Sequence, residues 1–231
     1  MIGVEMGWRQ LLFANWPVEP EVVERGLPEG LEVDTYDGKA WLSVVPFTNV
    51  AVRPRGLPDS IGVDLPELNL RTYVTVPGED RPAVFFYSLD ADGWLSVLGA
   101  RLTFGLPYYN ADIKIVERDG AIRYRSRRAH PGDQPLRFDA QYEPTGDRLD
   151  AEPGSLAAFL TERYRFYVGG PGGTIAYANV DHDVWSLRPA TVEFRKNEIF
   201  RANNFAEPDG EPTCYYSSGV DIVSSGRKWL K

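Results

Sequence analysis

The chain has 231 residues, of which 43% are apolar and 13% aromatic, enough for one large domain with its own core. A net charge of −8 argues against a nucleic-acid partner, because polyphosphates bind basic surfaces. There is no apolar run of membrane-spanning length, no secretory signal and only one cysteine, Cys214, so we expect a cytoplasmic protein without a membrane partner or a disulfide.

Apolar periodicity and turn residues predict a chain made mainly of strands. Short helices are expected at 20–26, where Pro20 stands at the start, and at 155–167, where Ser155 is the N-cap. Strands are expected at 31–36, 40–47, 49–53, 67–76, 82–88, 94–104, 110–118, 121–128, 136–142, 174–180, 190–195 and 214–223. This pattern predicts one α+β domain over residues 1–231, built around an antiparallel sheet or a closed barrel.

The predicted strand ELNLRTYV (67–74) alternates apolar or β-branched residues with the polar side chains of Glu67, Asn69, Arg71 and Tyr73. Glu67 and Arg71 lie about 13 Å apart along a strand, too far for a direct ion pair. A buried Arg71 would therefore need a partner from Asn69, another strand or a ligand. The alternation alone favours a polar face in contact with solvent.

The segment RLTFGLPYYNADIK (101–114) contains a second group of polar residues. Gly105-Leu106-Pro107 interrupts a strand pattern, and Tyr108, Asn110, Asp112 and Lys114 then share one face. Arg101 opens the same segment. These side chains are the second candidate lining of a binding site.

Other motifs give weaker support for chemistry. Asp181-His182-Asp183 offers metal-binding side chains, but neighbouring residues of a strand point to opposite faces, so a hydrogen-bonding His182 is the favoured interpretation. The glycine-rich run 168–174 lacks the lysine of a phosphate loop. The basic hairpin 118–128 is typical of a solvated edge. We therefore predict no metal and no cofactor.

Several segments occur together in the order seen in one family. They are WRQLLFANWPV (8–18), AWLSVVPF (40–47), ELNLRTYV (67–74), GLPYYNAD (105–112), PGSLAAFLTERY (153–164) and HDVWSL (182–187). The chain thereby resembles the YqjF-like family, a branch of the acetoacetate decarboxylase-like superfamily. The resemblance implies a cone-shaped, largely antiparallel closed barrel with a few short helices outside it and an active-site cavity within.

The sequence departs from the decarboxylases where their chemistry resides. Their cavity carries a G-[FY]-P-K-K segment whose first lysine forms a Schiff base. Here Gly105 and Pro107 match that pattern, whereas Tyr108 and Tyr109 occupy the lysine positions. A phenol cannot form an imine, and Lys114 lies too far along the chain to replace the lysine. Schiff-base decarboxylation should therefore be absent.

The resemblance also changes the interpretation of the strand 67–74. Glu67 looks like the cavity glutamate of the decarboxylases, and a barrel-lining strand would turn its polar face toward a confined cavity. The resemblance thus favours a binding site over a solvated face.

Three functions follow from these observations. The first is a small-molecule binding barrel for an anionic or carbonyl-bearing ligand, and its predicted ligand-binding residues are Glu67, Asn69, Arg71, Tyr73, Arg101 and Tyr108. The second is an enzyme without an imine, in which Glu67 acts as acid or base and Tyr108 donates a proton. The third is a structural protein without a cavity. A homo-oligomer is compatible with all three, since the related decarboxylases form large oligomers.

Overall fold

The computed structural model describes residues 3–79, 81–93, 107–130 and 132–230. The strands are β1 (Val4–Val18), β2 (Glu32–Val33), β3 (Ala40–Pro54), β4 (Val63–Thr75), β5 (Ala83–Asp92), β6 (Tyr108–Arg118), β7 (Ala121–Arg128), β8 (Arg137–Pro144), β9 (Arg165–Gly169), β10 (Ile175–Asp181), β11 (Arg188–Asn197), β12 (Thr213–Ser224) and β13 (Lys228–Trp229). The helical segments are α1 (Pro20–Glu24), α3 (Leu156–Thr161), α4 (Ile199–Ala202) and the 3₁₀ turns η1 (Asp59–Ile61) and η2 (Pro171–Gly173).

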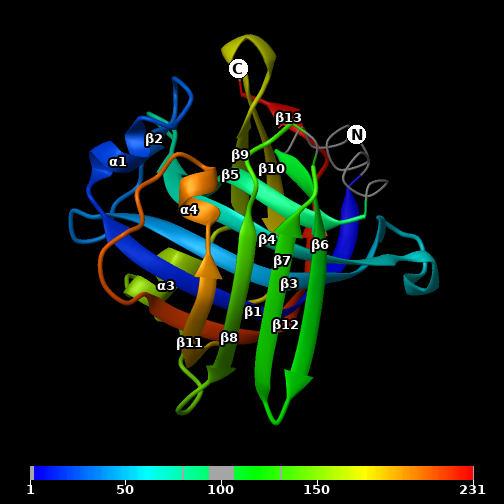
Figure 1. Cartoon of the computed structure of the whole chain (residues 1–231). Coiled ribbons are helices and arrows are strands. Elements are labelled where there is room, and N and C mark those ends of the chain that lie inside the picture. The colour runs from blue at the N-terminus through cyan, green and yellow to red at the C-terminus, as the bar shows by residue number, and fades with distance from the viewer. Residues whose placement is uncertain (1–2, 80, 94–106, 131, 231) are drawn as a thin grey trace.

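Nine strands close into a mixed barrel, so the predicted fold class is confirmed (Figure 1). They follow one another in the order β5-β6-β7-β8-β11-β12-β1-β3-β4, and β4 pairs with β5 to complete the ring. Described neighbours pair antiparallel except at β5, which runs parallel to both β6 and β9. The short helices lie outside the barrel.

The barrel forks because β5 and β12 each change partners along their length. The first half of β5 pairs with β9 and its second half with β6. Likewise, β12 pairs first with β11 and then with β10. The β9–β10 hairpin therefore closes a second ring with β12, β1, β3, β4 and β5, and it rises above the strands at the front of Figure 1. We call the five strands common to both rings the shared wall.

Strand β4 in the shared wall is buried on both of its faces. Every residue from Glu67 to Val74 is buried. Leu68 and Leu70 pack into the large apolar core of the nine-strand ring, whereas Tyr73 packs into the core of the second ring. The interpretation of 67–74 from alternation alone is therefore wrong, because a second ring covers the face that would otherwise meet solvent.

The described strands match most of the predicted ones, but β1 was not predicted, and the predicted strands 40–47 and 49–53 form the single strand β3. The predicted helix 155–167 ends as α3 at Thr161, because residues 165–167 already pair in β9. Its N-cap is Ser155, whose side chain accepts a hydrogen bond from the Ala158 N–H. The predicted strand 94–104 lies outside the described residues. The described helices are all too short or too polar to cross a membrane.

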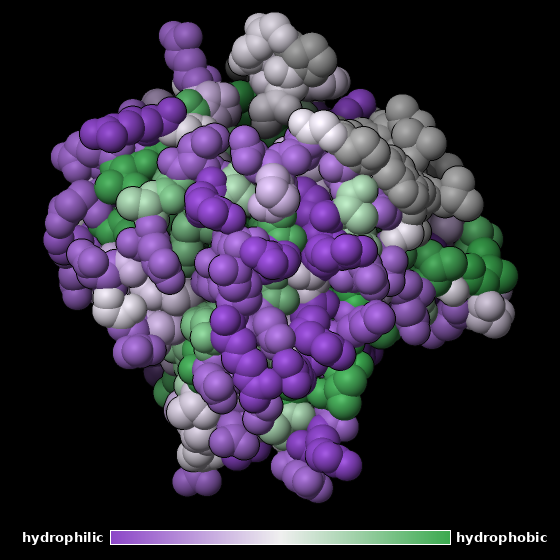
Figure 2. Space-filling view, in the orientation of Figure 1, coloured by the Kyte–Doolittle hydropathy of each residue, from purple (hydrophilic) through white to green (hydrophobic). Residues whose placement is uncertain are grey.

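The outer face of β6, β7 and β8 is strongly hydrophilic (Figure 2). Arg125 and Arg127 are exposed on it, and Arg123 pairs with Asp139 through two hydrogen bonds of 3.1 and 2.9 Å. This surface agrees with the solvated hairpin predicted for residues 118–128. The apolar core of the nine-strand ring lies directly behind it.

Candidate functional site

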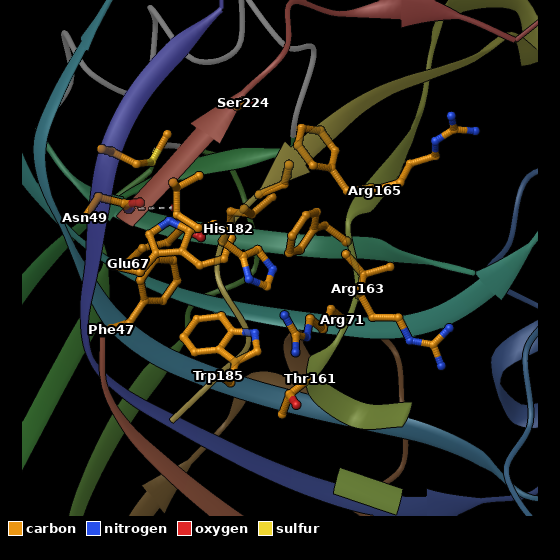
Figure 3. Close-up of a pocket in the computed structure, with 18 of the residues that line it drawn as sticks. Phe47, Asn49, Glu67, Arg71, Thr161, Arg163, Arg165, His182, Trp185 and Ser224 are labelled. Atoms are coloured by element: carbon orange, nitrogen blue, oxygen red, sulfur yellow. Dashed lines mark hydrogen bonds between the residues drawn. The ribbon is translucent and has the colours of Figure 1, made fainter. Parts of the chain in front are cut away.

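A small cavity lies on the second-ring side of the shared wall (Figure 3). Its volume is about 90 Å³, where about 10–15 Å³ of such volume holds one water molecule, so there is room for several waters or a small organic acid. It is lined by β1, β3, β4, β5, β9, β10 and β12, together with Tyr108, Thr161, Arg163 and the segment 182–185. This volume suits a small ligand.

Glu67 forms the polar end of the cavity. This buried carboxyl group accepts hydrogen bonds from the Tyr108 hydroxyl at 2.7 Å and from the side-chain amides of Asn49 and Asn69 at 3.2 Å each. Burial raises the pKa of Glu67, and the three donors oppose that rise. Burial and the neighbouring Glu67 also raise the pKa of Tyr108 far above its usual range, so the phenol keeps its proton.

Arg71 occupies another part of the same lining, beside Trp185 in Figure 3. Its side chain is buried, and Nη2 donates to the Leu160 carbonyl at the end of α3, 3.0 Å away. The Phe13 ring centroid lies 5.3 Å from Cζ. Among the described residues, Nε has no hydrogen-bond partner and no carboxylate lies within ion-pair distance of the guanidinium. The described contacts that stabilise the charge of Arg71 are therefore one backbone carbonyl and aromatic rings.

Two further arginines line the cavity but already have acidic partners. Arg163 pairs with Asp34 at 2.6 Å, and Arg165 pairs with Glu79 at 2.8 Å. Their guanidinium groups point away from the cavity in Figure 3. This leaves Arg71 as the described arginine of the lining that has no acidic partner among the described residues.

Three aromatic nitrogens in the lining also lack partners within the described part of the chain. They are Nε1 of Trp8, Nε1 of Trp185 and Nε2 of His182, and each is shielded from solvent. The two indoles stack with centroids 5.9 Å apart, and the imidazole centroid lies 5.2 Å from that of Trp185. Buried polar groups are normally hydrogen-bonded, so a cluster of unpaired nitrogens at one cavity indicates a place for a ligand oxygen.

Sequence reasoning missed the role of these aromatic residues. Trp8 and Trp185 stand in two of the segments that carry the family resemblance, and a buried indole that needs an acceptor was the available signal. His182 was interpreted as a hydrogen-bonding residue rather than a metal ligand. Its Nδ1 does contact the Asp183 carbonyl at 2.8 Å. No group of three potential metal ligands occurs among the described residues.

The predicted ligand-binding residues fall into three groups. Glu67, Arg71 and Tyr108 line the cavity. Asn69 and Tyr73 lie behind the lining: Asn69 holds Glu67, while the Tyr73 hydroxyl donates to the Leu160 carbonyl at 2.9 Å. The remaining candidate, Arg101, lies outside the described residues.

The DUF2071 family of uncharacterized conserved proteins matches residues 5–221 of the chain. The chain belongs to this family. It is also 41% identical over 224 residues to the uncharacterized protein YqjF of Bacillus subtilis (strain 168), an alignment that covers 96% of this chain and 90% of YqjF. The recognition made from the six sequence segments is thus confirmed.

Solved structures of the acetoacetate decarboxylase-like fold are similar to this member of the DUF2071 family. Acetoacetate decarboxylase from Legionella pneumophila superposes with a TM-score of 0.68 at 14% identity, over 99% of this chain and 87% of that one. The enduracididine biosynthesis enzyme MppR, complexed with pyruvate, gives a TM-score of 0.68 at 13% identity, over 99% and 90% of the two chains. At these identities the likeness shows the fold.

The described lining of the cavity contains no lysine. Tyr108 stands in the lining, at the first of the two positions where the decarboxylase segment has its lysines, and holds Glu67. Lys114 lies on the outer face of β6, in a shallow groove with Arg125 and Asp139. An imine between a ligand carbonyl and a described lysine is therefore incompatible with this cavity.

Proposed function

We propose that this protein binds a small organic anion in the cavity, with Arg71 as the counter-ion. The observation that carries the proposal is the buried guanidinium of Arg71, which has no acidic partner among the described residues. Burying an unpaired charge costs several kcal/mol, and a ligand carboxylate would remove that cost through two charge-assisted hydrogen bonds.

The other unpaired groups support an oxygen-rich ligand. The Trp8 and Trp185 indoles can only donate hydrogen bonds, and both line the cavity with a buried N–H that has no described partner. Carboxylate oxygens satisfy such donors, whereas ammonium ions and hydrocarbons do not. The stacked indoles also provide an apolar wall for a short carbon chain.

The cavity volume of about 90 Å³ suits a ligand of a few non-hydrogen atoms. A 2-oxo or 3-oxo carboxylate fits, with its carboxylate at Arg71 and its carbonyl toward Glu67 and Tyr108. The fold of the chain is shared with a protein crystallised with pyruvate and with a protein whose substrate is acetoacetate by its name. Both compounds belong to the proposed ligand class.

A panel of small carboxylates tests this proposal by thermal shift. Acetate, pyruvate, acetoacetate, lactate and inorganic phosphate are added to wild type, Arg71→Met and Arg148→Met. The control residue Arg148 is exposed and pairs with the exposed Asp150 at 3.3 Å. At least one carboxylate should stabilise wild type and Arg148→Met but not Arg71→Met. Equal stabilisation of all three proteins would place the anion elsewhere and contradict the proposal.

Acid–base catalysis is the second candidate function, and the Glu67–Tyr108 pair favours it. Burial raises the pKa of Glu67, which suits a group that exchanges a proton with a ligand near neutral pH. If the pair is catalytic, pyruvate should exchange its methyl protons with D₂O faster in wild type than in Glu67→Gln, as followed by proton NMR. Equal exchange in the two proteins would leave ligand binding as the proposed function.

A further inference from the structure

We infer that the cavity takes up a proton together with its anion, and that His182 carries this proton. The inference rests on the proposed anion site and adds to it a residue that sets its pH dependence. His182 begins the segment between β10 and β11, half-buried, and its ring borders the same cavity as Arg71 (Figure 3).

The hydrogen bond at Nδ1 determines what Nε2 can do. Nδ1 lies 2.8 Å from the backbone carbonyl of Asp183. A carbonyl only accepts hydrogen bonds, so Nδ1 must carry a hydrogen. Nε2 is then a bare lone pair when the ring is neutral and an N–H donor when the ring is an imidazolium. Nε2 is shielded from solvent and has no described partner. Its protonation state therefore affects how a ligand binds in the cavity.

An anion in the cavity meets one of two surfaces. With neutral His182, the lone pair of Nε2 faces the ligand oxygens and repels them. With protonated His182, Nε2 joins the indole nitrogens of Trp8 and Trp185 and the guanidinium of Arg71 as a donor. Only the protonated ring thus completes a set of donors around the anion.

The charged groups around His182 explain why the ligand shifts this balance. On its own segment, Asp181 and Asp183 are exposed acids. From the start of β9, Tyr164 stacks on the ring with centroids 4.5 Å apart and donates to Glu162, which also accepts the Trp185 backbone N–H at 3.0 Å.

Strand β4 contributes Arg71 and Glu67 to the same lining, and the lining residues from β1 and β12 are uncharged. A bound anion adds negative charge to the cavity that the imidazole borders, so we propose that binding and protonation reinforce each other.

The sign of the pH effect follows from this linkage. If the complex holds one more proton than the free protein, the affinity rises as the pH falls, by at most about tenfold per pH unit for a single proton. The change should occur between about pH 5 and 8, where imidazole titrates.

Calorimetric titration with pyruvate measures both consequences. Binding is followed from pH 5.5 to 8.5, and at one pH in Tris and in Bis-Tris, cationic buffers that differ in ionisation enthalpy and do not compete for an anion site. Wild type should bind more tightly as the pH falls, with up to one proton taken up per pyruvate.

His182→Gln should lose both effects. The chain has two histidines, which makes His130→Gln a matched control that should behave as wild type. Should His182→Gln fail to fold, the imidazole NMR signals of wild type report the same event. The titration midpoint of His182 should then move to higher pH when pyruvate is added.

The outcomes separate this inference from the proposed function. If wild type binds neither pyruvate nor any other carboxylate of the panel at any pH, the proposed function and this inference both fail. Binding without a pH slope or proton uptake contradicts the inference alone and leaves the role of Arg71 intact. A slope that persists in His182→Gln assigns the proton to another group, in the first place Glu67, and overturns the role of His182.

Discussion

Two arginines are buried on opposite sides of the shared wall, and they are held differently. Arg128, on β7 inside the nine-strand ring, donates through Nε and Nη2 to both carboxylate oxygens of Asp90, at 2.7 Å each. The side chains of this pair are 3% and 0% exposed. Arg71, on the second-ring side, has no such carboxylate within the described part of the chain.

The difference is the basis of the proposal that Arg128 serves the fold whereas Arg71 binds a ligand. Arg128 has its counter-ion Asp90 on β5, the strand beyond β6 in the same ring, and the Tyr109 ring centroid lies 3.9 Å from its Cζ atom. Arg71 borders a cavity in which other donors are also unpaired. Stability should therefore depend on Asp90 and Arg128, whereas anion binding should depend on Arg71.

The largest effect is expected from breaking the complete pair. Asp90→Ala leaves Arg128 buried without its carboxylate, and such a loss typically costs about 3–5 kcal/mol. Chemical denaturation measures the change in the free energy of unfolding. Asp150→Ala, which breaks an exposed pair, is the control and should stay within about 0.5 kcal/mol. A loss below about 1 kcal/mol for Asp90→Ala would mean that the Asp90–Arg128 pair does not stabilise the fold, which contradicts the contrast drawn with Arg71.

A smaller loss is expected at Glu67, the acid on the cavity side. Glu67→Ala removes the acceptor of Tyr108, Asn49 and Asn69, which should cost about 1–3 kcal/mol near pH 4.

The pH dependence of that loss gives a second test. Burial raises the pKa of Glu67 in the folded state, so wild type loses stability as the pH rises above 4.5, the value for an unperturbed glutamate. The alanine variant lacks this loss, and the difference between the two proteins should narrow toward neutral pH. A difference that widens with pH would mean that Glu67 is ionised throughout.

Glu198 contrasts with Glu67, because the pKa of Glu198 is lowered and not raised. It accepts hydrogen bonds from Arg137 at 2.9–3.3 Å and pairs with Lys196 and Arg201 at 3.2 and 3.1 Å. The Arg137 hydrogen bonds are the main cause that lowers its pKa to about 2.

The stabilisation from Glu198 is present above pH 4.5 and is lost as the pH falls toward 2. Glu198→Gln should cost about 1–2 kcal/mol at pH 7, since its partners are largely exposed. Denaturation at pH 7 and pH 2.5 should show that cost shrinking at the lower pH. If the stability difference between wild type and Glu198→Gln were the same at both pH values, the lowered pKa of Glu198 would be contradicted.

The smallest effect on stability is expected at Arg71 itself. Arg71→Met removes a buried charge that has no acid beside it among the described residues and keeps an apolar side chain of similar length. Without ligand, the variant should lose less than about 1 kcal/mol of unfolding free energy, and a gain is expected where the relieved cost of the unpaired charge exceeds the lost hydrogen bond to Leu160. Urea denaturation in a buffer free of small carboxylates measures this. A loss of 3 kcal/mol or more would mean that Arg71 has a counter-ion within the protein.

The sequence predicts most of the fold and part of the cavity. Turn residues and alternation predicted most of the described strands but missed β1 and placed the start of β9 in a helix. Six ordered segments identified the family and hence the closed barrel. Glu67 and Tyr108 could be placed near each other because the resemblance aligned both with cavity positions. The structure joins them by a hydrogen bond of 2.7 Å.

The rest depends on contacts between distant segments that one sequence does not reveal. Alternation in 67–74 is the same whether solvent or a second ring covers the polar face, so the burial of Arg71 could not be read from it. Trp8 and His182 meet because β12 pairs with β1 on one side and with β10 on the other. That no acid of the described residues lies beside Arg71 is a property of the assembled cavity.

A crystal structure of the protein grown with pyruvate tests the central claim most directly. We expect the carboxylate of pyruvate in the cavity, with its oxygens about 2.7–2.9 Å from the guanidinium nitrogens of Arg71. The claim would be contradicted if the cavity held only water at high pyruvate concentration, or if a carboxylate of the chain itself lay against Arg71.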